Sequence, residues 1–306
     1  MPRQIGALQA RIEYAGIAAL ARGLAALPLE RAVRLGSALG DVAARLDRFN
    51  RPVAMRNLAI AFPEKSDAER LGILREMYRN WGRMLAEFTH FSEFNRDNIE
   101  RYVTYDTREN LNRALELADG RGALIVTAHF GNFELLALAH SAYGHRLAIV
   151  QRPLRNPLIA TLVNDARTRL GNQIVTRKAG GRAMFRMLRE NRHVAIALDL
   201  DVRRGVFVDF FGMKASTSDG LARLAAATSA PVVPAFMVRE GDSARHRIVV
   251  WPVVEMVAGA DKEACVVENT QRITNVIEEM IRRHPGHWNW IHRRWKTRPP
   301  GEKRFY

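Results

Sequence analysis

A histidine and a glutamate five positions apart are the residues of this chain whose types and spacing are best suited to chemistry. His129 stands two residues after an apolar run at residues 123–127, and Glu134 opens a helical segment. On one continuous helix the two side chains would point about 140° apart. They can converge only if the chain turns between them, which Gly131 permits and which Asn132 favours as a helix N-cap.

A carboxylate beside an imidazole can accept a hydrogen bond from one ring nitrogen and leave the other nitrogen free to take a proton from an alcohol. Acyl transfer to a hydroxyl needs such a base. It also needs donors for the developing oxyanion, which the N–H groups of a helix start or a guanidinium can supply. The same residues also suit a structural histidine followed by an acid in the first turn of a helix.

Short apolar runs alternate with helical segments from residue 121 onward. The runs have the length of buried strands and cover residues 123–127, 147–151, 194–198 and 232–238. The helical segments cover residues 134–143, 158–170, 182–192 and 221–227. This alternation predicts an α/β fold with a mainly parallel central sheet flanked by helices, and ligands of such sheets bind at the carboxyl ends of strands. Pro234 has no N–H group, so we expect it at a strand edge and not in a central ladder.

The first third of the chain is predicted to be mostly helical. Residues 31–46 have the periodicity of an amphipathic helix. Ser66 and Glu69 have the spacing of a capping box, which predicts that another helix begins there and runs past Trp81.

The apolar stretch at residues 14–29 predicts contact with a membrane surface. It carries Arg22 near its middle and is shorter than the about 20 apolar residues that span a bilayer, and no signal-peptide cleavage site follows it. An interfacial helix fits this pattern, with a core helix of a soluble protein as the alternative. We therefore expect an N-terminal helical membrane-associating region over residues 1–48 and a catalytic domain over residues 49–306.

The chain is strongly basic, with a formal net charge of +15. Such a charge attracts phospholipid, nucleic acid or an acidic protein. Residues 281–306 alone hold eight basic side chains and one acidic side chain, interleaved with Trp288, Trp290 and Trp295. These tryptophans could stack on bases or sit at a membrane interface. Because Cys265 is the single cysteine, an intramolecular disulfide and a cysteine-built zinc site are excluded.

Residues 128–134, Ala-His-Phe-Gly-Asn-Phe-Glu, resemble the central motif of the bacterial lipid A biosynthesis acyltransferases, a family within the lysophospholipid acyltransferase-like group. Further blocks resemble the family in the same order, at residues 151–157, 201–212, 232–236 and 288–296. In that family a histidine and an acid activate the acceptor hydroxyl for direct attack on an acyl thioester. The resemblance thus implies that His129 is the base and that Glu134 is its partner.

The resemblance also implies contacts with the substrates. Arg152 could bind a phosphate or the oxyanion, because a guanidinium offers paired donors. Arg203 and Arg204 could clamp acceptor phosphates or form a solvated turn. The expected substrate-binding residues are Arg152, Asn132, Asp201, Arg203 and Arg204. Leu200 and Asp209 depart from the family pattern in the block expected to form the acceptor wall, and this leaves the identity of the acceptor open.

As partners the resemblance implies acyl carrier protein or acyl-CoA as donor and a glycolipid acceptor. We expect no cofactor and no nucleic acid. We also expect no metal, because no acid or cysteine accompanies His284, His287 and His292. The expected location is the cytoplasmic face of the inner membrane, bound peripherally to its anionic surface. One alternative is another acceptor: a mannosylated phosphatidylinositol, a lysophospholipid or an aminolipid. The non-enzymatic alternative is a basic protein that binds anionic lipid or nucleic acid. The sequence lacks the motifs of serine hydrolases, P-loop proteins and dinucleotide-binding enzymes.

Overall fold

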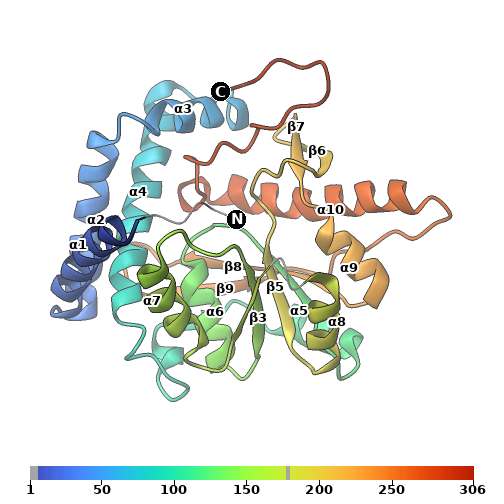
Figure 1. Ribbon diagram of the computed structural model, residues 1–306, viewed down its shortest axis with the longest axis horizontal. Helices are drawn as coiled ribbons and strands as arrows, with labels where there is room; N and C mark the ends of the chain where they lie inside the picture. Colours follow the sequence, from blue (N-terminus) through green and yellow to red (C-terminus); the bar gives the residue numbers. More distant parts are fainter. Residues whose placement is uncertain (1–5, 177–179) are drawn as a thin grey trace.

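The computed structural model describes residues 6–176 and 180–306, which are organised around one sheet. The described strands are β1 (Val103–Tyr105), β2 (Leu124–Thr127), β3 (Leu147–Gln151), β4 (Gln173–Thr176), β5 (His193–Ala197), β6 (Val206–Phe210), β7 (Met213–Thr217), β8 (Val232–Arg239) and β9 (His246–Val250). Seven of them form a sheet in the order β1-β9-β8-β2-β5-β3-β4, while β6 and β7 form a separate hairpin (Figure 1). Only the β8–β9 pair within the sheet is antiparallel, which confirms the predicted α/β fold with a mainly parallel sheet.

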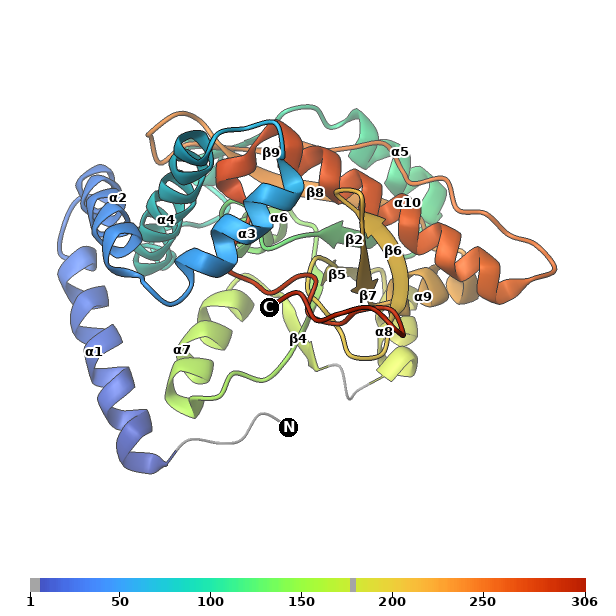
Figure 2. The same cartoon turned by 90° about the horizontal axis from the view of Figure 1, so that it is seen from above.

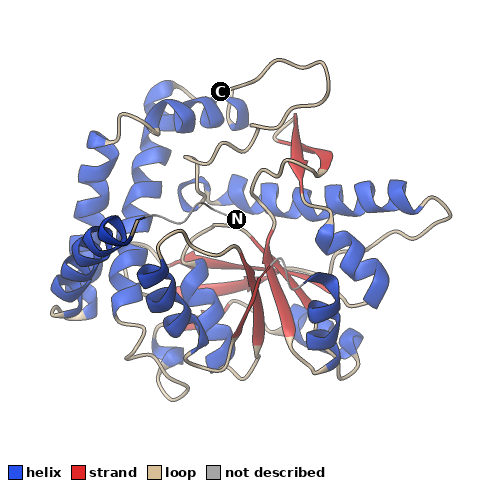
Figure 3. Cartoon of the chain, in the orientation of Figure 1, coloured by secondary structure: helices blue, strands red, loops and turns tan. Residues whose placement is uncertain are grey.

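Helices cover both faces of this sheet (Figure 3). The described helices are α1 (Ala7–Ala25), α2 (Leu29–Leu46), α3 (Arg51–Ala61), α4 (Asp67–Thr89), α5 (Glu109–Ala118), α6 (Phe133–Ala142), α7 (Pro157–Thr168), α8 (Gly180–Arg189), α9 (Gly220–Thr228) and α10 (Lys262–Arg283). One apolar cluster joins the sheet to α5 and α6, and a second joins the other face to α8, α9 and α10.

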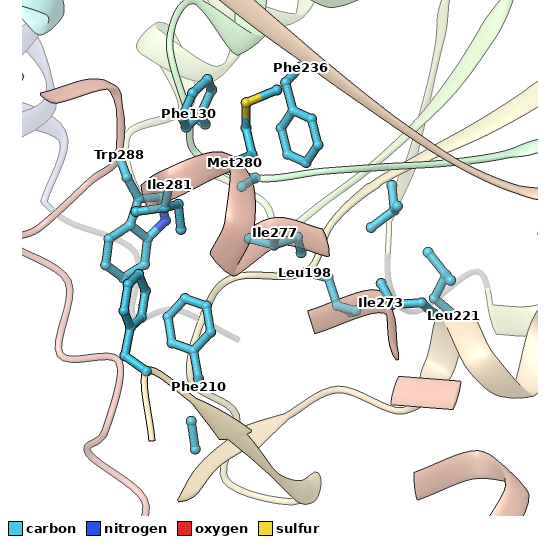
Figure 4. Packing of buried hydrophobic residues seen from close by; sticks show 14 of the residues in the cluster. Phe130, Leu198, Phe210, Leu221, Phe236, Ile273, Ile277, Met280, Ile281 and Trp288 are labelled. Atoms are coloured by element: carbon cyan, nitrogen blue, oxygen red, sulfur yellow. The ribbon is translucent and has the colours of Figure 1, made fainter. Parts of the chain in front are cut away.

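Alternate residues of each central strand enter these two clusters because side chains of a strand point to opposite faces. In β2, Leu124 and Val126 belong to the cluster with α10, whereas Ile125 belongs to the cluster with α6. Figure 4 shows Ile273 and Ile277 of α10 within the cluster that joins the sheet to α8, α9 and α10. Both faces are buried, so these strands read as continuous apolar runs in the sequence.

The N-terminal helices pack beside the sheet through α4. The predicted capping box is present, since the Ser66 hydroxyl accepts from the Glu69 N–H and the Glu69 carboxylate accepts from the Ser66 N–H. Close contact between α2 and α4 depends on glycine: a Cβ added at Gly82 would lie 1.9 Å from the Gly36 carbonyl oxygen.

The apolar stretch at residues 14–29 is not one helix. It covers the second half of α1, a short connection and the first residue of α2, because Pro28 precedes the first turn of α2 and ends the continuity. Among the described helices, none combines the length and apolar character needed to cross a membrane.

Pro234 lies in β8, between β2 and β9, so the prediction of a strand-edge position was wrong. The β8–β9 register begins at Ala235, one residue after the proline. Pro234 still accepts a bond from the N–H of Trp251 through its carbonyl oxygen. The proline is tolerated in a central strand because it stands where the antiparallel ladder ends, and there a missing N–H removes only the terminal bond.

Candidate active site

The chain turns sharply after β2 and carries His129 into a cavity at the carboxyl end of the sheet. Gly131 has a φ of +55°, and a Cβ there would lie 2.0 Å from the carbonyl oxygen of Met237. Only glycine fits this turn. Asn132 then caps α6, because its Oδ1 accepts from the N–H of Leu135 at 2.9 Å. The predicted turn and N-cap are therefore both present.

Asp199 is the carboxylate that contacts the His129 imidazole. Its Oδ1 lies 2.9 Å from His129 Nδ1, and its Oδ2 accepts from the His129 backbone N–H at 2.9 Å. Trp288 donates to the same Oδ2 through its indole N–H at 2.8 Å. Asp199 is buried, while the His129 side chain is 29% exposed. A carboxylate accepts and does not donate, so the proton of the neutral imidazole lies on Nδ1 and the lone pair on Nε2.

The charges of this pair stabilise each other. Burial opposes ionisation of Asp199, but the nearby His129 and the hydrogen bonds from His129 and Trp288 lower the pKa of its carboxyl to about 2. Burial likewise opposes protonation of His129, yet the charge and hydrogen bond of Asp199, with a smaller effect of Glu134, raise the pKa of the imidazole above its ordinary value. An imidazolium formed during a reaction would therefore be stabilised.

Glu134 lies near His129 but binds a different partner. Its carboxylate forms a two-point ion pair with Arg167 of α7, in which Arg167 Nε donates to Oε2 at 2.7 Å. The same guanidinium donates to the Gln151 side chain. The imidazole thus donates to Asp199 and not, as predicted, to Glu134. Glu134 acts on His129 through its charge and not through a hydrogen bond.

His129 and Glu134 line an apolar cavity of about 330 Å³ that lies between α6 and the sheet. Its size falls within the usual range of ligand pockets. Ile125, Ala195 and Ile149 lie side by side on three adjacent strands and line its middle. Leu147 lines its inner end, four residues before Gln151 at the mouth, which gives a depth of about 13 Å at the rise of a parallel strand. His140 of α6, bonded to the Tyr105 hydroxyl at 2.6 Å, also lines the cavity.

Comparison with known proteins identifies the family of this chain. The family model described as bacterial lipid A biosynthesis acyltransferase matches residues 3–297. The chain belongs to this family. It is 31% identical over 279 residues to the lipid A biosynthesis lauroyltransferase of Escherichia coli K12, which covers 90% of this chain and 88% of the relative. The palmitoleoyltransferase of the same organism is 29% identical over 276 residues (89% and 87%), and the myristoyltransferase is 26% identical over 295 residues (96% and 89%). The protein is accordingly an acyltransferase.

Within this acyltransferase, the residues expected to bind substrate occupy four environments. Arg152 is exposed and lines the cavity mouth. Arg203 and Arg204 are exposed on a bend before β6. Asp201 holds the C-terminal segment, because its two oxygens accept from the N–H and hydroxyl of Thr297, each at 3.0 Å. Asn132 is buried, and its amide N–H donates to Glu87 and not into the cavity.

The three C-terminal tryptophans are fully buried, so both predicted roles for them, base stacking and membrane-interface contact, were wrong. Trp288 packs edge-on against Phe210 (Figure 4) and against Trp290, and its indole donates to Asp199. Trp295 packs against Phe210 from another side. The aromatic side chains of this segment form part of the core and support the site from behind.

Sequence reasoning did not assign a role to Asp199 or Arg167. A signal for Asp199 existed, because β2 and β5 are adjacent parallel strands and each is followed two residues later by a polar side chain. The register pairs Thr127 with Ala197, which brings His129 opposite Asp199. The position of Arg167 within its helix gave no comparable signal.

The hydrogen-bond pattern predicts that Asp199→Asn reverses the tautomer of His129. The amide oxygen must accept from the His129 N–H and the Trp288 indole, so the amide N–H₂ faces Nδ1 and the proton moves to Nε2. Loss of the charge should also lower the pKa of His129. Nitrogen-15 NMR of histidine-labelled protein would report both changes. Retention of an Nδ1 proton and of the raised pKa would contradict the assigned geometry.

Proposed function

We propose that this protein is an O-acyltransferase that moves a fatty acyl group from an acyl thioester to a hydroxyl of a lipid A precursor or related glycolipid. One observation carries the proposal: Nε2 of His129, which has no hydrogen-bond partner among the described residues, lies at the mouth of a deep apolar cavity. The cavity suits a hydrocarbon chain, and the free nitrogen suits a hydroxyl proton. The names of the relatives, which specify lauroyl, myristoyl and palmitoleoyl transfer in lipid A biosynthesis, support the same acceptor.

In the proposed reaction, the acceptor hydroxyl gives its proton to Nε2 of His129 while its oxygen attacks the thioester carbonyl carbon. A new C–O bond forms, and the carbonyl oxygen becomes negatively charged. The C–S bond then breaks, and the leaving thiolate takes the proton back from the imidazolium. Asp199 orients the ring and stabilises its positive charge, and Glu134 adds a second negative charge nearby. The atoms balance with no cofactor.

Exposed arginines, of which Arg152 lines the cavity mouth, support binding of anionic substrates. We assign Arg152 to the oxyanion or to a substrate phosphate, because it lines the mouth and has no hydrogen-bond partner within the described chain. Arg203 and Arg204 are exposed and are assigned to acceptor phosphates. The same basic surface would attract an acidic acyl carrier protein, with acyl-CoA as the alternative donor. A different lipid acceptor would use the same chemistry.

The N-terminal helices support peripheral binding to the cytoplasmic face of the inner membrane. On α2, Leu35, Leu39, Val42 and Leu46 recur at helical spacing and are all exposed. Leu8 and Ile12 of α1 and Phe49 are also exposed. Figure 2 shows α1 and α2 at one end of the molecule, away from α5. We assign residues 1–48 to the membrane-associating region and residues 49–306 to the catalytic domain, because an exposed apolar surface of this kind suits a lipid surface.

His129→Ala is expected to lower turnover by about 10² to 10⁴ with the fold intact, because a general base contributes about this much. In wild-type protein, turnover should rise with pH through the raised pKa of His129, since only the neutral ring accepts a proton. Once His129 is lost, adding Asp199→Asn or Glu134→Ala should cost little, because residues that act as a unit are non-additive.

The measurement is acyl transfer from a defined acyl carrier protein thioester to a lipid A precursor, with circular dichroism as the control for folding. Normal turnover in folded His129→Ala protein would place the base elsewhere. Acylation of another lipid, but not of the lipid A precursor, would keep the chemistry and replace the acceptor.

Ala195→Leu should shift the enzyme toward shorter acyl donors, because a larger side chain would fill the middle of the cavity. We expect kcat/KM to fall by about 10- to 200-fold for the longest accepted chain and to change little for a short chain. Ala195→Ser is the control, because serine is close to alanine in size and leaves the cavity open. Competition between thioesters of different length measures the preference. An unchanged ranking in folded Ala195→Leu protein would mean that the chain binds elsewhere.

A triple variant with Leu39→Ser, Val42→Ser and Leu46→Ser should weaken binding to vesicles that contain anionic phospholipid. The substitutions replace exposed apolar side chains and should leave the fold unchanged. Leu117→Ser on α5 alters a similarly exposed leucine far from α2 and is the control. Vesicle flotation in low and high salt measures binding. Equal flotation of the triple variant and the wild type would exclude this surface as the membrane contact.

A further inference from the structure

Glu87 of α4 is a fully buried carboxylate that the reaction above does not use. It does not line the cavity, yet four donor atoms converge on its two oxygens. Arg239, at the end of β8, binds it with both Nη atoms. His246, at the start of β9, donates from Nε2 at 2.9 Å. The fourth donor is the side-chain amide of Asn132, at 2.6 Å.

Electrostatics keep this carboxylate charged and its partners fixed. Burial opposes ionisation, but His246 and Arg239 lower the pKa of the Glu87 carboxyl to about 2. An ionised carboxylate only accepts, so every group around it must donate. The side-chain oxygen of Asn132 must therefore point away from Glu87. It does so by capping α6 at the N–H of Leu135.

Asn132 is the member of this cluster that belongs to the His129 turn. The turn is held from three directions. Asp199 accepts from the His129 N–H, the backbone carbonyl of His287 accepts from the Gly131 N–H at 2.8 Å, and Glu87 accepts from the Asn132 amide. The Glu87 bond is the one that ties the turn to the N-terminal helices, because Glu87 comes from α4.

We propose that Glu87 is a positioning residue for acyl transfer: by accepting from the Asn132 amide, it fixes the turn that aims the His129 imidazole at Asp199. This inference rests on the proposed role of His129 as base. Glu87 touches no substrate in this arrangement. Its effect passes through the orientation of Asn132, and from there to the start of α6 and the ring of His129.

Asn132→Ser separates the two roles of the asparagine. Serine is a good N-cap and so keeps α6 capped, but its hydroxyl is too short to replace the amide donor to Glu87. We expect kcat to fall by about 10- to 100-fold with KM unchanged, since small misplacement of a reacting group has costs of this size. Asn156→Ser is the matched control, because Asn156 also caps a helix, α7, and its amide also donates to a carboxylate, that of Glu13.

A donor swap tests the link directly. Asn132→Asp alone places two carboxylates together and should reduce kcat more than serine does. Adding Glu87→Gln restores one donor and one acceptor across the same bond and keeps one negative charge beside Arg239. We expect the double variant to regain at least tenfold in kcat over Asn132→Asp. The fold-loss of kcat is also measured for Asn132→Asp alone and for Glu87→Gln alone. If the fold-loss in the double variant equals the product of these two, Glu87 and Asn132 act independently and the inference fails.

A second readout does not depend on activity. Nitrogen-15 NMR of labelled histidines, with the His129 signal identified by its absence from His129→Ala, should show the pKa of His129 moving toward its ordinary value in Asn132→Ser and staying raised in Asn156→Ser. Wild-type kcat and an unshifted His129 titration in folded Asn132→Ser protein would overturn the proposal. Normal turnover of His129→Ala, with the NMR shift present, would instead overturn only the role of His129 as base.

Discussion

A carboxylate removed from water must find hydrogen-bond donors within the protein, and the arrangement of this site follows from that requirement at Asp199. Three donors meet it: the backbone and ring of His129 and the indole of Trp288. They come from the end of β2 and from the segment after α10, while Asp199 itself follows β5. These hydrogen bonds to Asp199 link the ends of β2 and β5, hold the C-terminal segment at Trp288 and fix the tautomer of the His129 imidazole.

The two faces of the sheet meet two different requirements: close packing for stability and open volume for a ligand. One face is filled by α10, where Ile273, Ile277 and Met280 pack without access to solvent. The other face carries small side chains such as Ala195 opposite α6, and these leave the cavity open. Close packing on the first face stabilises the fold, so the second face can keep an open volume beside the reacting groups.

Local features of this chain were predictable from sequence, whereas contacts between distant segments were not. The turn at Gly131, the Asn132 cap and the Ser66–Glu69 capping box each depend on a few neighbouring residues, and all three are present. Asp199 lies 70 positions after His129, so their contact depends on which strands are neighbours. Glu134 was predicted to reach the imidazole because its spacing allowed it. The positively charged Arg167, brought in by α7, bonds to it instead.

The buried Trp288 makes the site depend on a segment that is synthesised near the end of the chain. Asp199 has its indole donor only when Trp288 is in place, and the N–H of Asn289 also bonds to the His129 carbonyl oxygen. During synthesis, β2 and β5 can pair long before either residue exists. In a nascent chain that ended within α10, Asp199 would therefore lack its indole donor, and the His129 carbonyl oxygen would lack its bond from Asn289. The hydrogen bonds of the His129–Asp199 pair can therefore be completed only after synthesis has passed residue 289.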